Sequence, residues 1–307
     1  MRATRGRAAS RAAPWVTLAV LCVACASTPT STGPVADDDV ITVGSSDFPE
    51  SELLAELYAQ ALERAGFEVR RAFDVGPREL LMPALQRGLV EVVPEYEGSA
   101  LAFLGGHPSA DPIEEHDALL DALGPRGLTA LRPARAEDRN AFVVTAVTAD
   151  RLDVRSLSDL RTDAGALRFG GPPECQDRPL CLGGLRDVYG LRFASFTPLD
   201  AGGPVTLQAL REGFVDVGLL FSTAAALEGP EFVQLVDDRR LEPSERVVPV
   251  IRDDLATRFG SGPTDALDAV SASITTTGLR AMNAAVAAGT PIAAVASAWL
   301  IDHVRSD

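Results

Sequence analysis

Short apolar runs alternate with longer amphipathic segments along most of the chain. The apolar runs are rich in Val, Ile and Phe and have the length of strands, whereas the longer segments repeat their apolar residues with helical spacing. Strands are predicted at residues 41–45, 67–75, 90–96, 141–147, 167–170, 193–196, 215–221, 232–236 and 247–251. Helices are predicted at residues 51–64, 78–87, 116–123, 183–188, 206–211, 265–287 and 292–304. This alternation predicts an α/β fold with mostly parallel sheets.

One pattern of helix and strand occurs twice in the sequence. Residues 84–99 read ALQRGLVEVVPEYEGS, and residues 209–224 read ALREGFVDVGLLFSTA. Upstream of the two copies, Gly76-Pro77 corresponds to Gly203-Pro204. Because several matches occur in the same order, we predict two similar α/β lobes.

The two copies carry an aromatic residue at the same place, Tyr96 in the first and Phe221 in the second. Ligands of open α/β sheets bind outside the carboxyl ends of the strands. If the lobes face each other, their loops form a cleft, and the two rings act as a clamp that closes around a ligand. The alternative is that both rings belong to the hydrophobic core.

The composition narrows the classes of function. A chain of 307 residues suggests two domains at about 150 residues each. It has 43 acidic and 28 basic residues and a net charge of -15, which disfavours nucleic acid as a partner because phosphates need a basic face. Every basic residue is an arginine, which excludes a Schiff-base lysine and a lysine-containing phosphate loop.

The chain lacks the usual signatures of an enzyme. It contains no G-x-S-x-G elbow, no H-E-x-x-H motif and no G-x-G-x-x-G loop. Its 3 histidines are too few for a multi-histidine metal site and stand in polar surroundings, at His107, His116 and His303. We therefore expect no catalytic residue, no metal and no cofactor, and an enzyme is disfavoured.

The first 25 residues have the pattern of an export signal. Several arginines precede an apolar stretch from Trp15 to Cys25, which is shorter than the roughly 20 residues that span a bilayer. Ala24 before Cys25 resembles a bacterial lipobox, although Cys22 stands where leucine is usual. We expect residues 1–25 to be the signal, Cys25 to be lipidated, and residues 26–39 to form a flexible tether to the membrane. Cleavage and secretion without a lipid is the alternative.

The two remaining cysteines, Cys175 and Cys181, lie close together in the sequence. An exported protein meets an oxidising environment, so we predict a disulfide between them that shapes a local loop. A redox or metal-binding pair is the alternative, but the spacing is not that of a C-x-x-C motif.

Two segments carry residues suited to binding a cation. The loop after the first strand contains Asp47, Phe48 and Ser51, and the second segment reads PEYEGS around Tyr96. Aromatic faces attract protonated or quaternary amines, and the nearby acidic residues add a field of the same sign. From the other lobe, Arg178 suits a carboxylate. Asp47 could instead cap the following helix, and Arg178 could be a surface ion pair.

At these residues the chain resembles the substrate-binding proteins of ABC importers for glycine betaine, choline and related osmoprotectants. The similar stretches include VGSSDFPESELLAELYAQALERAGFEV, GPRELLMPALQRGLVEVVPEYEGSAL, FGGPPECQDRPLCLGGLRDVYGL and ALREGFVDVGLLFST. The resemblance implies a type II periplasmic-binding-protein fold, with two lobes, a hinge and a ligand cleft between the lobes. It assigns residues 40–143 plus 250–307 to lobe 1 and residues 144–249 to lobe 2. It also implies an ABC permease in the membrane, with its ATPase, as partners.

The resemblance also assigns roles to single residues. Tyr96 would contribute to an aromatic cage, Phe142 and Phe221 stand where the family has tyrosines, and Arg178 corresponds to the arginine that grips the ligand carboxylate. The remaining ligand-binding candidates are Asp47, Phe48, Ser51, Ser99, Asn140 and Ser222.

The chain departs from the family in its tyrosines. It contains 3 tyrosines, at Tyr58, Tyr96 and Tyr189, so a cage of four cannot be built. Phenylalanine supplies the same π face but no hydroxyl. We therefore expect an exported receptor for a small quaternary-amine or zwitterionic solute similar to glycine betaine. The alternatives are a receptor for an amino acid or another polar amine, a secreted enzyme, and a sensor on a similar fold.

Overall fold

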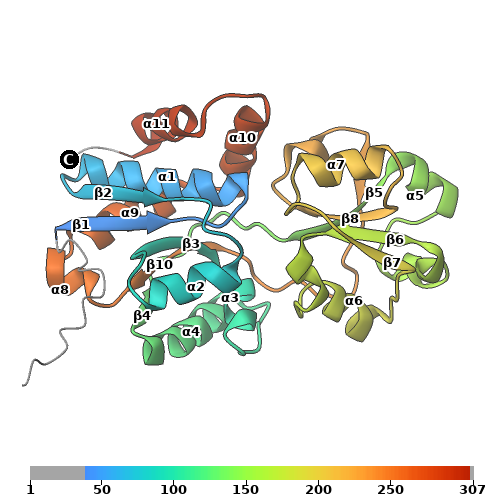
Figure 1. The fold of residues 1–307 in the computed structure, drawn as a ribbon, viewed down its shortest axis with the longest axis horizontal. Helices are drawn as coiled ribbons and strands as arrows, with labels where there is room; N and C mark the ends of the chain where they lie inside the picture. Colours follow the sequence, from blue (N-terminus) through green and yellow to red (C-terminus); the bar gives the residue numbers. More distant parts are fainter. Residues whose placement is uncertain (1–38, 305–307) are drawn as a thin grey trace, which may run out of the picture. The chain divides into compact units, whose positions relative to one another are not determined.

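The computed structural model of the protein describes residues 39–304 (Figure 1). The predicted signal, Cys25 and most of the predicted tether lie outside the described residues. The described part contains two five-stranded sheets, and we call each sheet with its helices a lobe.

The first sheet has the strand order β2-β1-β3-β10-β4. Its strands are β1 Val40–Gly44, β2 Glu68–Ala72, β3 Val92–Tyr96, β4 Leu128–Ala130 and β10 Val247–Arg252. β1 pairs in parallel with β2 and β3, whereas β10 runs antiparallel to β3 and β4. Every residue of β1 and β3 is buried, as expected for central strands covered on both faces.

The second sheet has the strand order β7-β6-β8-β5-β9. Its strands are β5 Asn140–Thr145, β6 Arg168–Gly171, β7 Ser195–Pro198, β8 Val217–Phe221 and β9 Phe232–Gln234. β6 pairs in parallel with β7 and β8, and β5 runs antiparallel to β8 and β9. The two sheets therefore repeat one arrangement, in which β3 and β8 hold the same central place.

This arrangement corrects the prediction of mostly parallel sheets. β5 and β10 are the strands through which the chain enters one lobe from the other. Val247, the first residue of β10, pairs with Tyr96, the last residue of β3. A chain that enters at the carboxyl ends of the parallel strands has to run in the opposite direction, so each sheet is mixed.

Helices cover the sheets of both lobes. Those of the first lobe are α1 Pro49–Arg64, α2 Arg78–Gln86, α3 Glu97–Phe103, α4 Pro112–Leu123, α8 Leu255–Phe259, α9 Gly262–Ser273, α10 Thr276–Ala287 and α11 Ile292–His303. Those of the second lobe are α5 Ala146–Leu152, α6 Leu182–Tyr189 and α7 Pro204–Arg211. The single helix expected at residues 265–287 is two helices, because Ile274 is extended and the Thr275 side chain caps α10 by accepting from the Gly278 amide.

Each lobe has its own hydrophobic core. In the first lobe, Leu53, Leu57 and Tyr58 of α1 are fully buried, and α1 packs against α9 and α11. In the second lobe, Phe169 of β6 and Tyr189 of α6 belong to the core. Separate cores allow the two lobes to move as units about the segments that join them.

Two connecting segments, residues 131–139 and 235–246, join the lobes (Figure 1). The lobe boundaries expected at residues 143 and 249 fall inside β5 and β10. Because ladder hydrogen bonds assign each strand to one sheet, all of β5 belongs to the second lobe and all of β10 to the first. The boundaries therefore move into the connecting segments.

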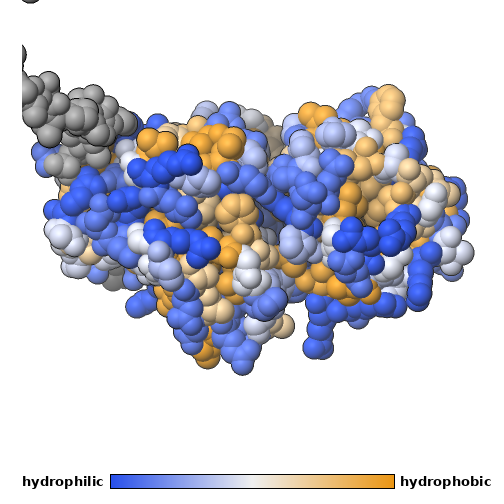
Figure 2. All heavy atoms as spheres, turned by 60° about the horizontal axis from the view of Figure 1, so that its bottom comes forward, coloured by the Kyte–Doolittle hydropathy of each residue, from blue (hydrophilic) through white to orange (hydrophobic). Residues whose placement is uncertain are grey.

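Hydrophilic and hydrophobic residues are mixed over the face drawn in Figure 2. Large apolar side chains such as Ile113, Val147 and Phe214 are exposed, but single exposed apolar residues are normal and do not identify a site. Within residues 39–304, no helix is both long and apolar enough to cross a membrane. Within the same residues, no group of three metal-binding side chains is arranged to hold a metal ion.

Candidate ligand-binding site

The candidate site lies at the carboxyl ends of the parallel strands of both sheets. Phe48 follows β1, Tyr96 ends β3, Arg178 follows β6, and Phe221 ends β8. Parallel strands bring their carboxyl ends to one edge of a sheet, so the repeat places these four residues at equivalent edges of the two lobes.

Three aromatic rings meet at this edge. The ring centroid of Phe48 is 5.1 Å from that of Phe221 and 6.3 Å from that of Tyr96. Phe48 and Phe221 are partly exposed, whereas Tyr96 is 8% exposed and packs behind Phe48. Aromatic surface from both lobes thus comes together around Phe48.

A buried polar network fixes the back of this aromatic group. The Tyr96 hydroxyl donates to a Glu50 carboxylate oxygen at 2.7 Å. Glu50 also accepts from the Thr223 hydroxyl of the second lobe and from the Asn283 amide of α10. Asp138 of a connecting segment accepts from the Thr223 backbone amide at 3.0 Å. Burial, reinforced by the neighbouring Glu50, raises the pKa of Asp138 well above its usual range.

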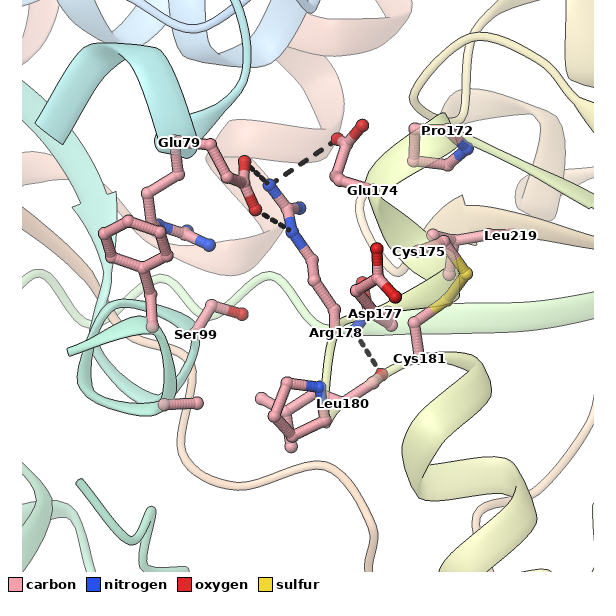
Figure 3. A pocket seen from close by; sticks show the side chains of 15 residues that line it. Glu79, Ser99, Pro172, Glu174, Cys175, Asp177, Arg178, Leu180, Cys181 and Leu219 are labelled. Carbon is pink, nitrogen blue, oxygen red and sulfur yellow. Dashed lines mark hydrogen bonds and ion pairs between the residues drawn. A yellow bond between two sulfur atoms is a disulfide. The ribbon is translucent and has the colours of Figure 1, made fainter. Parts of the chain in front are cut away.

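Two neighbouring cavities lie on the Arg178 side of the site, and the smaller of them adjoins the aromatic group. The larger has a volume of about 310 Å³ and lies beside the disulfide loop (Figure 3). The smaller has a volume of about 40 Å³ and is lined by Phe48, Phe221 and Asp47. Both are lined by Arg178 and Asn140, so they are neighbouring parts of one interlobe site.

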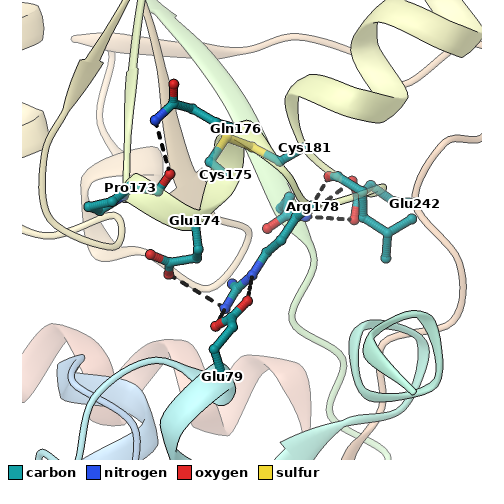
Figure 4. Close-up of a disulfide and its surroundings, with 10 residues drawn as sticks. Glu79, Pro173, Glu174, Cys175, Gln176, Arg178, Cys181 and Glu242 are labelled. Carbon is teal, nitrogen blue, oxygen red and sulfur yellow. Dashed lines mark hydrogen bonds and ion pairs between the residues drawn. A yellow bond between two sulfur atoms is a disulfide. The ribbon is translucent and has the colours of Figure 1, made fainter. Parts of the chain in front are cut away.

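Arg178 reaches across this site to the first lobe (Figures 3 and 4). Its Nε and Nη2 donate to the two carboxylate oxygens of Glu79 at 3.2 and 2.9 Å. Its Nη2 also lies 3.5 Å from a carboxylate oxygen of Glu174. Burial raises the pKa of Glu79, but the hydrogen bond and the charge of Arg178 outweigh it, and the pKa is lowered overall.

The second arginine of the site, Arg78, is also paired with a carboxylate. Its Nε and Nη2 donate to Glu95, which is 3% exposed, at 2.8 to 3.0 Å. Burial alone would lower the pKa of Arg78, but the Glu95 charge raises it above its usual value. Arg78 therefore stays charged next to the cavity.

Two buried glutamates of a connecting segment hold polar residues of the cavity wall. Glu245 accepts from the Ser99 hydroxyl at 2.7 Å and from the Ser99 amide at 3.1 Å. Glu242 accepts from the Asn140 side-chain amide at 3.3 Å. Burial raises the pKa of Glu245 to about 7, and burial together with the Glu245 charge raises the pKa of Glu242 well above its usual range.

The close approach of this connecting segment explains one glycine of the PEYEGS stretch. A Cβ atom at Gly98 would lie 2.2 Å from Cγ of Pro243, which is a clash that backbone movement would have to relieve. Glycine at this position therefore allows Glu245 to reach Ser99.

The predicted disulfide between Cys175 and Cys181 is confirmed, with Cα atoms 5.2 Å apart (Figure 4). Both cysteines line the larger cavity. The backbone amide of Cys181 donates to the Arg178 carbonyl at 3.1 Å, so the disulfide closes the loop that carries Arg178.

The structure brings six of the ten predicted ligand-binding residues to the walls of the two cavities. These are Asp47, Phe48, Ser99, Asn140, Arg178 and Phe221. Asp47 does not cap α1, because Phe48 holds the N-cap position of that helix and no side chain caps it.

Four predicted residues lie away from these walls. Phe142 is 2% exposed and contacts Phe169 in the core of the second lobe, because it lies two residues into β5 from the open edge at which Asn140 stands. Tyr96 packs behind Phe48. Ser51 accepts from the Ser46 amide inside its loop, and Ser222 donates to Asp138 in a turn. These residues shape the site from behind.

Glu79, Glu174 and Arg78 line the site but were not predicted from the sequence. Arg78 and Glu79 begin α2 directly after Gly76-Pro77. The correspondence of that dipeptide with the second copy of the repeat was a signal that this helix begins at the cleft. The role of Glu50 depends on contacts with two distant segments, and its local sequence carries no sign of them.

Comparison with known proteins gives the family. A family model described as the substrate binding domain of ABC-type glycine betaine transport systems matches residues 39–302. The chain is 27% identical over 250 residues to a glycine-betaine-binding protein of Pseudomonas aeruginosa, covering 78% of this chain and 79% of that protein. It is 24% identical over 260 residues to the glycine betaine-binding protein YehZ of Escherichia coli, covering 80% of this chain and 85% of that protein.

A solved structure gives the fold independently. A crystal structure described as a glycine betaine/carnitine/choline ABC transporter superposes with a TM-score of 0.67 at 22% identity, covering 87% of this chain and 100% of that chain. This likeness confirms the predicted two-lobed α/β fold. Because the family model spans nearly all of the described residues, the chain belongs to the family of substrate-binding domains of ABC-type glycine betaine transport systems.

Proposed function

We propose that this protein binds a small solute with a quaternary or protonated amine in the interlobe site and delivers it to an ABC permease. The observation that carries the proposal is the pair of partly exposed rings, Phe48 and Phe221, which meet from the two lobes at 5.1 Å. A cationic group over such faces gains about 0.5–2 kcal/mol per contact.

The electrostatics of the site support a cationic ligand. Arg78 and Arg178 are each paired with a glutamate, and the carboxylates of Glu174 and Asp177 also line the larger cavity. An excess of negative charge in a concave site with apolar walls concentrates cations there.

The relatives support the same class of ligand. Two of them are named as glycine betaine-binding proteins, and the similar solved structure is named for glycine betaine, carnitine and choline. Because each is less than 30% identical to this chain, the choice among such solutes rests on the residues of this site.

Each residue of the site has a distinct part in the proposed binding. Phe48 and Phe221 contact the cation, and Tyr96 supports Phe48 from behind. Ser99 and Asn140 contact the rest of the ligand in the larger cavity, which Arg178 crosses to reach Glu79. Because contacts come from both lobes, the ligand stabilises the closed form, which docks to the permease.

A receptor for an amino acid or another polar amine is the second candidate. Phe221 provides a π face without a hydroxyl where the family has a tyrosine, and Phe142 is buried in the core. A polar amine would use the same acidic residues and would depend less on the rings. An enzyme or a sensor on this fold has no observation in its favour.

We also propose that the protein is exported and held at the membrane by a lipid on Cys25. Substrate-binding proteins of ABC importers are extracytoplasmic, and a tethered receptor stays close to its permease and ATPase. Labelling of cells with a radioactive fatty acid tests the anchor. Label in the wild type and its loss in Cys25→Ser support the lipid, and equal label in both would contradict it.

A thermal-shift panel tests the ligand class. Glycine betaine, choline, carnitine, proline and common amino acids are each added to the purified protein. A ligand at 100 times its Kd adds about 2.7 kcal/mol to the free energy of unfolding, which gives a clear rise in Tm. Shifts with the quaternary amines support the proposal, shifts with amino acids alone favour the second candidate, and no shift with any member contradicts both.

A further inference from the structure

We propose that Glu79 sets the charge selectivity of the site, so that it prefers ligands with a net positive charge over zwitterions. The inference rests on the proposed function and concerns which member of the quaternary-amine class the site takes. It follows from the partners of the two arginines in the cleft.

The first step concerns the Nε–Nη2 edge of the Arg178 guanidinium, one of its two edges that can hold a carboxylate with paired hydrogen bonds. Glu79 already takes both hydrogen bonds of this edge. Glu174 approaches Nη2 as well. A ligand carboxylate at this position has to displace Glu79 and bears the repulsion of Glu174.

The second step concerns Arg78, the other arginine of the larger cavity. Its Nε and Nη2 donate hydrogen bonds to the Glu95 carboxylate, as those of Arg178 do to Glu79. The side chains of Arg78 and Glu95 are 10% and 3% exposed. Exchange of such a buried partner costs more than exchange at the surface. Arg78 is therefore not an alternative anchor for a ligand carboxylate.

The third step concerns why Glu79, and not Glu174, determines the selectivity. Glu79 comes from α2 of the first lobe, while Arg178 and Glu174 share the loop after β6 in the second lobe. The Glu79 side chain is 39% exposed, so its carboxylate lies at the cavity within reach of a ligand. It therefore neutralises Arg178 from the opposite wall and leaves the cavity with surplus negative charge from Glu174 and Asp177.

Choline and glycine betaine form a matched pair for the test. Both have a trimethylammonium group, but choline carries an alcohol where glycine betaine carries a carboxylate. Their dissociation constants are measured by calorimetry for the wild type, for Glu79→Gln and for Glu79→Ala. We expect the wild type to bind choline more tightly. We expect both variants to shift the ratio of the two constants toward glycine betaine by about tenfold, because Arg178 becomes available and one negative charge is lost.

The control is Glu231→Gln. Glu231 accepts two hydrogen bonds of 2.8 Å from Arg211 in an exposed pair of the second lobe, so this variant removes the same charge outside the cavities. It should leave the ratio unchanged.

The outcomes separate the inference from the function. A ratio that changes by less than about twofold in both Glu79 variants, or a wild type that prefers glycine betaine, overturns the inference and leaves the function standing. A wild type that binds neither solute overturns both.

Discussion

The ring of Phe48 contacts the ring of Phe221, with centroids 5.1 Å apart, although the two residues belong to different lobes. Phe48 follows β1 of the first sheet and Phe221 ends β8 of the second. The aromatic surface formed by the two rings therefore depends on how the two lobes are arranged. A cation bound beside this pair would meet one ring from each lobe.

Phe221→Leu tests the contribution of the second lobe. Leucine keeps much of the apolar volume but has no π face, so affinity for choline should fall by about 2- to 30-fold. Calorimetric titration measures the change. The matched control is Phe214→Leu, at an exposed position of the same lobe, which should bind as the wild type does. Equal affinity in Phe221→Leu and the wild type would mean that this ring does not contact the ligand.

Two substitutions at Tyr96 separate its ring from its hydroxyl. The hydroxyl donates to Glu50, which is 5% exposed and keeps two other donors. Tyr96→Phe should therefore lower the free energy of unfolding by about 1 kcal/mol and change affinity little. Tyr96→Ala should cost about 3–5 kcal/mol and weaken binding, because Phe48 loses its support. Urea unfolding and titration measure both quantities. Loss of binding in Tyr96→Phe with unchanged stability would assign the hydroxyl to the ligand instead.

The raised pKa of Glu245 predicts how stability depends on pH. An acid whose pKa rises from 4.5 to about 7 on folding holds its proton more tightly in the folded state. Its contribution is fully present below pH 4.5 and is lost as the pH rises through about 7. This group alone lowers the free energy of unfolding by about 1.4 kcal/mol per pH unit in that window.

Urea unfolding at several pH values between 5 and 7 tests this dependence. Glu245→Gln keeps an acceptor for Ser99 and has no charge to bury, so the decline in stability should be shallower in the variant. Carboxylates with a lowered pKa, such as Glu79 and Asp216, change the stability at lower pH. Within this window they are ionised in both the folded and the unfolded state. The same slope in the variant and the wild type would show that Glu245 does not titrate there.

The disulfide should matter for both stability and binding. Replacing Cys175 and Cys181 by serine opens a short loop and should cost about 2 kcal/mol. The loop carries Arg178 and lines the cavity, so affinity should fall as well. Thermal unfolding and titration in the presence of a reductant offer the same test on the wild type. Unchanged affinity after reduction would show that the fold holds the loop in place without the disulfide.

The sequence predicted the parts of the fold that depend on local pattern and on the repeat. The two copies correctly predicted that β3 and β8, with Tyr96 and Phe221 at their ends, are equivalent in two lobes. The antiparallel β5 and β10 were not predicted, because strand direction in a sheet depends on where the chain crosses between lobes. The break at Ile274 was missed because the apolar spacing continues from α9 into α10.

Sequence reasoning was less complete for the site. Strand ends and the family resemblance singled out Phe48, Asn140, Arg178 and Phe221, which line the smaller cavity. The sequence left two partners open for Arg178, a ligand carboxylate or an ion pair with the protein, and the structure pairs it with Glu79. In that pair, Glu79 lies at the start of α2 in the first lobe and Arg178 lies in the loop after β6 in the second. No local pattern in the sequence encodes a contact between them.

The account depends on recognition of positive charge by the rings of Phe48 and Phe221, and one comparison tests this most directly. Calorimetric titration of the purified protein with choline is set against 3,3-dimethylbutan-1-ol, which has the same shape and a neutral carbon in place of the nitrogen. We predict that choline binds at least about tenfold more tightly, because the neutral analogue gains no cation–π or ionic attraction. Equal affinity for the two, or binding of the alcohol alone, would contradict the account.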